Sequence, residues 1–172
     1  MRKLMVGREI NGEYYRADVS GSSGSEVLLK ADHISVRPWF QNISLEVHAG
    51  EILGFGGLSG SGMHEVGRAL FGIDKVLTGS VTLPRKGKEI TSPQSAVKNG
   101  MAYIPKDRDN ESIVLTGSIA NNILVPVWDK LENKVGFIRP GEEERVVQEQ
   151  IGKLGIKCRN GKQLVKELSG GN

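Results

Sequence analysis

A run of closely spaced glycines in the first half of the chain has the residue types needed to bind phosphate. Gly57 and Gly62 have the spacing of the pattern G-x-x-x-x-G-K-[ST] of phosphate-binding loops. Glycines allow tight turns that aim successive backbone N–H groups at an anion, and the dipole of a following helix adds to the attraction. The residues of this candidate loop are Gly57, Leu58, Ser59, Gly60, Ser61, Gly62, Met63 and His64.

The last two positions of this loop depart from the pattern. Met63 stands where a lysine would contact the β- and γ-phosphates, and His64 stands where a hydroxyl would bind Mg²⁺. Met63 carries no charge, and a neutral imidazole is a poor ligand for a hard cation that prefers oxygen. Since electrostatic stabilisation supplies most of phosphoryl-transfer catalysis, we expect a poor catalyst even where phosphate binds. A strand-to-helix turn that binds no ligand is the structural alternative.

The elements around the loop can be predicted from hydrophobic spacing and turn residues. Short strands are predicted at Val27–Ala31, His33–Val36 and Ile43–Val47. The apolar run Ile52–Phe55 predicts a buried strand directly before the glycines. Helical spacing then follows the loop, and Gly72 is positioned to end that helix. The loop is therefore predicted to join a strand to a helix, as phosphate-binding loops do.

Further elements complete an α/β pattern. Ser80–Leu83 and Met101–Ile104 are predicted strands. Between them, Ser92 is a candidate N-cap, Pro93 has the first helical position and Gly100 ends the helix. Two more helices are predicted at 118–124 and 140–154. Because strands and helices do not alternate strictly, we expect an α/β domain with a mixed sheet.

Composition excludes several classes of protein. The single cysteine, Cys158, rules out an intramolecular disulfide framework and fits a reducing compartment. No apolar run approaches the roughly 20 residues that span a bilayer. The 23 basic and 20 acidic residues form no basic stripe with interleaved aromatic residues, so we expect no nucleic-acid partner. His33, His48 and Cys158 do not have metal-ligand spacing, so no metal site is predicted.

Three segments in order resemble one family, the ABC importers for simple sugars such as ribose and galactose. They are Ala49–Gly62 followed by Glu65, then Ser92–Arg108, and finally Leu168–Asn172. The resemblance implies an ABC-type P-loop nucleotide-binding domain that is truncated at its signature motif. Proteins of this family carry two fused nucleotide-binding domains, and Leu4–Ile10 resembles the end of the first. We therefore expect residues 1–26 to be that domain's tail and a flexible Gly/Ser linker, and 27–172 to be the front of the second domain.

The resemblance also assigns roles to residues. It makes ATP the cofactor of the glycine loop, with Mg²⁺ expected in the family but not at Met63 and His64. The signature residues Leu168, Ser169, Gly170, Gly171 and Asn172 would cap the γ-phosphate of a nucleotide held by the partner domain. Lys106 stands at the Q-loop position, where we interpret it as a solvated lysine, and Trp39 is interpreted as packing rather than stacking on adenine.

The family's Walker B aspartate, catalytic glutamate, D-loop and switch histidine have no counterpart in the chain. No catalytic residue is therefore assigned, and we expect this chain alone to be inactive although the full-length family member is an ATPase.

The resulting hypothesis is the ATP-binding component of a simple-sugar importer, in which ATP hydrolysis drives transport. Its expected partners are the other nucleotide-binding domain of the same protein and transmembrane permease subunits, which residues near Asp107–Gly117 would contact. Its expected location is the cytoplasmic face of the inner membrane. The alternative is a degenerate, non-catalytic domain for dimerisation or regulation, which Met63, His64 and Lys106 favour. An unrelated P-loop enzyme is a third possibility that leaves the signature motif unexplained.

Overall fold

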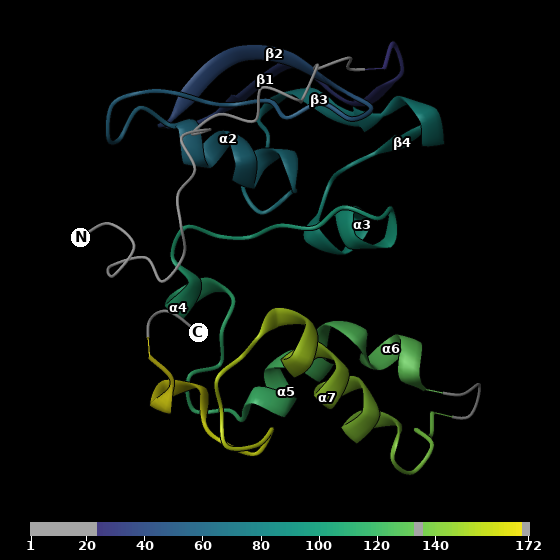
Figure 1. The fold of residues 1–172 in the computed structure, drawn as a ribbon. Helices are drawn as coiled ribbons and strands as arrows, with labels where there is room; N and C mark the ends of the chain where they lie inside the picture. The colour runs from purple at the N-terminus through teal and green to yellow at the C-terminus, as the bar shows by residue number, and fades with distance from the viewer. Residues whose placement is uncertain (1–23, 133–135, 170–172) are drawn as a thin grey trace, which may run out of the picture. The chain divides into compact units, whose positions relative to one another are not determined.

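The computed structural model describes residues 24–132 and 136–169, which divide into two compact units between Tyr103 and Ile104 (Figure 1). Most of the predicted tail and linker at 1–26 lies outside the described residues, so the boundary at residue 26 stays a prediction. Among the described helices, none is long and apolar enough to cross a membrane.

The first unit is built on a four-stranded sheet with the order β2-β1-β3-β4. The strands are β1 (Val27–Val36), β2 (Phe40–His48), β3 (Thr78–Leu83) and β4 (Lys88–Glu89), and every neighbouring pair is antiparallel. The two short strands predicted at 27–31 and 33–36 form the single strand β1, which is irregular at His33, where φ is 51°. The strands predicted at 43–47 and 80–83 are confirmed within β2 and β3.

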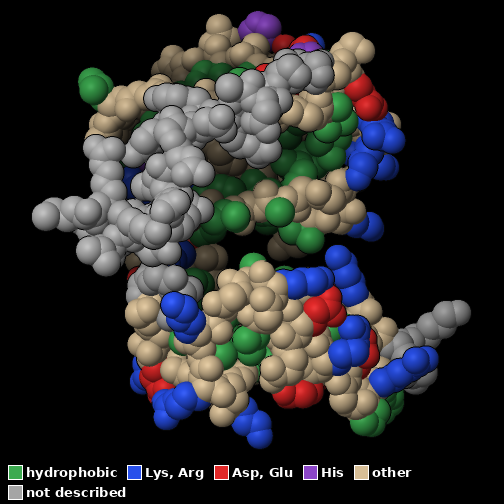
Figure 2. Space-filling view, in the orientation of Figure 1, with side chains coloured by type: hydrophobic (Ala, Val, Ile, Leu, Met, Phe, Trp, Pro, Cys, Tyr) green, Lys and Arg blue, Asp and Glu red, His purple; other side chains and the backbone are tan. Residues whose placement is uncertain are grey.

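Two helices complete the first unit, α2 (Met63–Leu70) and α3 (Pro93–Lys98), with the short 3-10 turn η1 (Pro84–Lys86) after β3. Figure 1 shows α2 beneath the sheet. The core joins one face of the sheet to both helices, with Ile34 and Val81 from the strands, Val66 and Ala69 from α2, and Ala96 from α3. In Figure 2, charged side chains gather at the β4 end of this unit and along its upper edge, and hydrophobic side chains are visible beside them.

The predicted strands Ile52–Phe55 and Met101–Ile104 are wrong. Both segments are irregular, and Ile52 and Ile104 are almost fully exposed. A buried strand of this kind requires a hydrogen-bonded neighbour on each side. Among the described residues, no strand lies beside either segment to provide those bonds. The predicted combination of sheet and helices is confirmed, although the described strand pairs include no parallel one.

The second unit is helical. It contains α4 (Arg108–Glu111), α5 (Ile119–Leu124), η2 (Val125–Val127), α6 (Trp128–Leu131), α7 (Glu142–Leu154) and η3 (Val165–Glu167). Helix α5 packs against α7, and the buried side chains are Ile119 and Leu124 of α5 and Val147 of α7. The helices predicted at 118–124 and 140–154 are confirmed, with α7 starting two residues late because Gly141 is its N-cap in a left-handed conformation.

Candidate functional site

The glycine loop leads directly into the N-terminus of α2, as the sequence predicts. After the turn that ends β2, residues 52–60 run exposed and irregular. A tight turn follows, in which the Ser61 N–H donates to the Leu58 carbonyl at 3.0 Å. Gly62 is the N-cap of α2, and its carbonyl accepts from the Val66 N–H at 3.0 Å. The free N–H groups of this first turn are the ones that suit an anion.

Two glycines give the loop its path. Gly60 and Gly62 have φ values of 80° and 87°, in the left-handed region that favours glycine. A Cβ atom on Gly62 would lie 2.9 Å from the Trp39 carbonyl oxygen, so a side chain there meets backbone. The main chain of Trp39 therefore packs against the end of the loop while its side chain is 46% exposed. The next residue, Phe40, belongs to the core.

The side chains around the loop offer little positive charge. The Ser61 hydroxyl faces Gly57, and a Cβ atom added at Gly57 would collide with it. The Met63 sulfur would lie 3.9 Å from that Cβ atom. A hydroxyl can donate to a phosphate oxygen, but a thioether can only accept weakly. His64 is exposed, and Glu65 adds a negative charge in the first turn of α2. The backbone thus fits a phosphate, whereas the side chains supply no fixed cation.

The turn that enters the loop is held by a carboxylate. Glu51 accepts a hydrogen bond from the His48 backbone N–H at 2.7 Å, and the same oxygen lies 3.1 Å from His48 Nδ1. These hydrogen bonds hold the pKa of Glu51 below its ordinary value. The far end of α2 is fixed by a two-pronged ion pair from Arg68 to Asp74, at 2.9 and 3.1 Å. Charged side chains therefore hold the turn before the loop and the far end of the helix after it.

A magnesium ion does not fit this loop. Met63 and His64 replace the lysine and the hydroxyl, so these two positions supply neither a fixed cation nor an oxygen ligand. Over residues 24–132 and 136–169, no group of three or more His, Cys, Asp or Glu side chains is placed to hold a metal. The prediction that Mg²⁺ is not bound here rests on the chemistry of these side chains.

Lys106 belongs to the second unit, whereas the glycine loop belongs to the first. Its side chain is exposed in an irregular segment. Next to it, Asp107 caps α4 by accepting from the Asn110 N–H at 3.2 Å and from Asn110 Nδ2 at 2.7 Å. These hydrogen bonds lower the pKa of Asp107. The Asp107 carboxylate therefore serves as the helix cap. The role of Lys106 at the Q-loop position stays a prediction.

Only the start of the predicted signature segment is described. The Leu168 N–H donates to the Val165 carbonyl at 3.0 Å after η3, and Ser169 is exposed. Gly170, Gly171 and Asn172 lie outside the described residues. A pocket of about 270 Å³ brings Leu168 and Ser169 together with Arg108, Ile113 and Leu115. Sequence spacing gives no sign of this proximity between 108–115 and 165–169.

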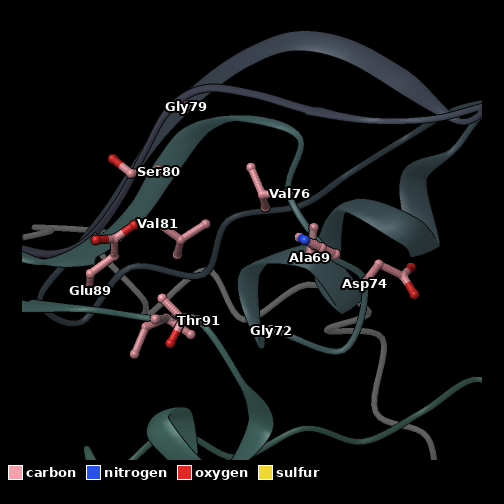
Figure 3. Close-up of a pocket in the computed structure, with 11 residues that line it drawn as sticks. Ala69, Gly72, Asp74, Val76, Gly79, Ser80, Val81, Glu89 and Thr91 are labelled. Carbon is pink, nitrogen blue, oxygen red and sulfur yellow. The ribbon is translucent and has the colours of Figure 1, made fainter.

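A second pocket, of about 170 Å³, lies apart from the glycine loop (Figure 3). It lies between the C-terminal end of α2 and strands β3 and β4, and it is lined in part by Val76, Val81 and Thr91. No residue of the candidate loop lines it. Its lining does not add to the phosphate-binding geometry.

Comparison with known proteins shows the family to which the chain is similar. The family model described as ABC transporter matches residues 40–172. The ribose import ATP-binding protein of Clostridium tetani is 38% identical over 170 residues, which is 98% of this chain and 33% of the relative. The corresponding protein of Lactococcus lactis subsp. lactis is also 38% identical, over 99% of this chain and 34% of its own.

A third relative adds galactose to the named sugars. The putative ribose/galactose/methyl galactoside import ATP-binding protein of Rhizobium johnstonii is 36% identical, over 99% of this chain and 33% of the relative. The chain spans about a third of the length of these curated relatives.

Proposed function

Because this chain belongs to the ABC transporter family, which implies ATP binding, we propose that it is part of the ATP-binding component of a simple-sugar importer. The observation that carries the proposal is the glycine loop, which joins the N-terminus of α2 through two left-handed glycines. The relatives named for ribose or galactose import match almost the whole chain and support the sugar assignment.

In this proposal the phosphates of ATP bind to backbone N–H groups between Leu58 and His64. The Ser61 hydroxyl, which faces Gly57, adds one neutral donor. Met63 provides no charge, and Glu65 opposes an anion at the first turn of α2. Binding is therefore weak, and it is nearly independent of Mg²⁺ because no oxygen ligand replaces the missing hydroxyl. In the whole protein, ATP hydrolysis would supply the free energy for sugar transport.

The remaining parts of the proposal concern partners. The segment Leu168–Asn172 would cap a nucleotide held by a second nucleotide-binding domain of the same protein. Residues near Asp107–Gly117 would contact transmembrane permease subunits at the cytoplasmic face of the inner membrane. Support comes from the family match and from the exposure of α4 and its flanking residues.

Chemical-shift mapping by NMR with ATP tests this assignment residue by residue. We expect ATP to shift the amide resonances of Gly57–His64 with a dissociation constant on the order of 1 mM. Adenosine, which has no phosphate, serves as the ligand control. The start of α7 is the matched protein control, because Glu142, Glu143 and Glu144 repel an anion from that helix N-terminus. If ATP and adenosine shift the loop amides equally, the degenerate interaction domain becomes the better assignment.

A further inference from the structure

His64 is the second residue of α2 and belongs to the loop that the proposed function assigns to phosphate. Its side chain is exposed, so it can meet a ligand without displacing packed residues. In a helix each Cα–Cβ bond tilts toward the N-terminus, so a side chain of the first turn leans toward the end where an anion binds. The imidazole of His64 is therefore attached beside the free N–H groups of α2.

The three histidines of the chain differ in their partners. His33 Nδ1 lies 3.0 Å from Asp32 Oδ1, and His48 Nδ1 lies 3.1 Å from Glu51 Oε2. Over residues 24–132 and 136–169, no hydrogen bond or ion pair engages the ring of His64. Both ring nitrogens of His64 are thus available to a ligand at the loop.

The charged groups on the elements around His64 are mostly compensated. On α2 and on β1, which shares its core, the ion pairs are Arg68–Asp74, Lys30–Glu46 and Asp32–His33. Glu65 is the acidic residue of the first turn of α2. Arg37, between β1 and β2, and Lys98, at the end of α3, are residue types whose charge is constant between pH 5 and 8. Within the loop and α2, a positive charge that is present only at acidic pH therefore belongs to His64.

We propose that His64, when protonated, supplies the cationic side chain that Met63 does not, so that the loop binds ATP more tightly as the pH falls. This inference rests on the proposed function, because it assigns regulation to the same phosphate site. Histidine is the side chain whose charge ordinarily changes between pH 5 and 8. Protonated imidazole donates from both ring nitrogens, and a charge-assisted hydrogen bond to phosphate is stronger than a neutral one.

ATP titrations at about pH 5.5 and about pH 8, followed by the methyl resonance of Met63, test the proposal. The terminal phosphate of ATP takes up a proton in the same range, so His64→Gln, which has no titrating ring, provides the baseline. At the lower pH we expect the wild type to bind ATP roughly fivefold more tightly than His64→Gln, as for an exposed ion pair. At the higher pH the two proteins should have equal affinity for ATP.

Two further variants separate an effect of charge from an effect on structure. His64→Lys carries a fixed charge, so at pH 8 it should bind ATP roughly fivefold more tightly than the wild type does. His33→Asn is the matched control, because His33 lies on β1 outside the loop. Asparagine tolerates the left-handed backbone of that position, where φ is 51°. This control should keep the pH dependence of the wild type.

Equal affinity of His64→Gln and wild type for ATP at pH 5.5 would overturn the inference. A change of pH dependence in His33→Asn as large as that in His64→Gln would also overturn it. Either result leaves the proposed function standing, because ATP still binds at the loop. Absence of ATP binding to all of these proteins at both pH values would overturn the proposed function and the inference with it.

Discussion

Of the two glycines of the candidate loop with positive φ, Gly62 tolerates a side chain less than Gly60. Both Gly60 and Gly62 have positive φ, but a Cβ on Gly60 meets open space whereas one on Gly62 meets the Trp39 carbonyl. We expect Gly60→Ala to lower the free energy of unfolding by about 1–2 kcal/mol, the usual cost of that backbone region. Gly62→Ala should cost clearly more because a contact with backbone is added. Urea denaturation measures both, and equal losses would contradict the packing of Trp39 on Gly62.

Glu51 gives the entry turn a defined dependence on pH. Its hydrogen bonds with His48 lower its pKa in the folded state. Because the pKa of Glu51 is lower in the folded state, the stabilisation is fully present at pH values above its pKa in the unfolded chain. It is lost as the pH falls through its pKa in the folded protein. The matched variant is Glu51→Gln, which keeps an acceptor but cannot ionise. We expect the wild type to have a higher free energy of unfolding than Glu51→Gln at pH 6. The difference between the two proteins should shrink toward pH 3.

Denaturation of both proteins at a series of pH values measures this difference. A gap that stays constant from pH 6 to pH 3 would show that the Glu51 charge does not act in the turn.

At the residue scale, the sequence predicts the chemistry of the loop but not what surrounds it. Glycine spacing and the missing lysine are visible from residues alone. The contact of Gly62 with the Trp39 main chain and the approach of Ser61 to Gly57 are not visible. Both depend on how chain segments meet in space, which spacing along the chain does not encode.

At the element scale, local signals predict helix ends well. Ser92 caps α3, with its Oγ accepting from the Ser95 N–H at 3.2 Å, and Gly100 follows with φ of 86°. The strand at 52–55 fails because a strand requires neighbours from elsewhere in the chain, and apolar composition alone does not provide them. Local caps are therefore predictable, whereas the pairing of strands is not.

The cap of α3 can be tested by substitution. Ser92→Ala removes the acceptor for the Ser95 N–H, so we expect the free energy of unfolding to fall by about 1 kcal/mol. Ser92→Asp keeps an acceptor at the same position and should cost much less. Thermal or urea denaturation measures the two variants side by side. Equal stability of Ser92→Ala and wild type would mean that the cap contributes nothing.

At the scale of the whole molecule, the two units have unequal cores. The first unit buries a cluster of strand and helix residues centred on Ile34, Val81 and Ala69. In the described part of the second unit, the buried hydrophobic residues are Ile119, Leu124 and Val147. Burial of apolar surface is the main stabilising contribution, so the second unit should open more readily.

Hydrogen exchange followed by mass spectrometry measures that difference. We expect the amides of β1 and β3 to exchange at least tenfold more slowly than those of α5 and α7. Equal protection across both units would show that they unfold as one cooperative body.

The family could be predicted from three separated motifs, because their joint order is far more specific than any one of them. The domain boundary at residue 26 and the roles of Gly170, Gly171 and Asn172 stay predictions, since they fall wholly or mostly outside the described residues. The motifs do not predict that residues 52–58 are exposed. That exposure depends on the absence of a neighbouring strand among the described residues.

The central claim is that the loop keeps the backbone half of a phosphate site and lacks its side-chain half. Titration of ATP against wild type, Met63→Lys and Met63→Lys with His64→Thr, with and without Mg²⁺, tests it most directly. A charge-assisted contact contributes about 1.5–3 kcal/mol, so Met63→Lys should tighten ATP binding roughly 10- to 100-fold. The double variant should gain dependence on Mg²⁺. Unchanged affinity in Met63→Lys would show that the loop is not a phosphate site and would contradict the account.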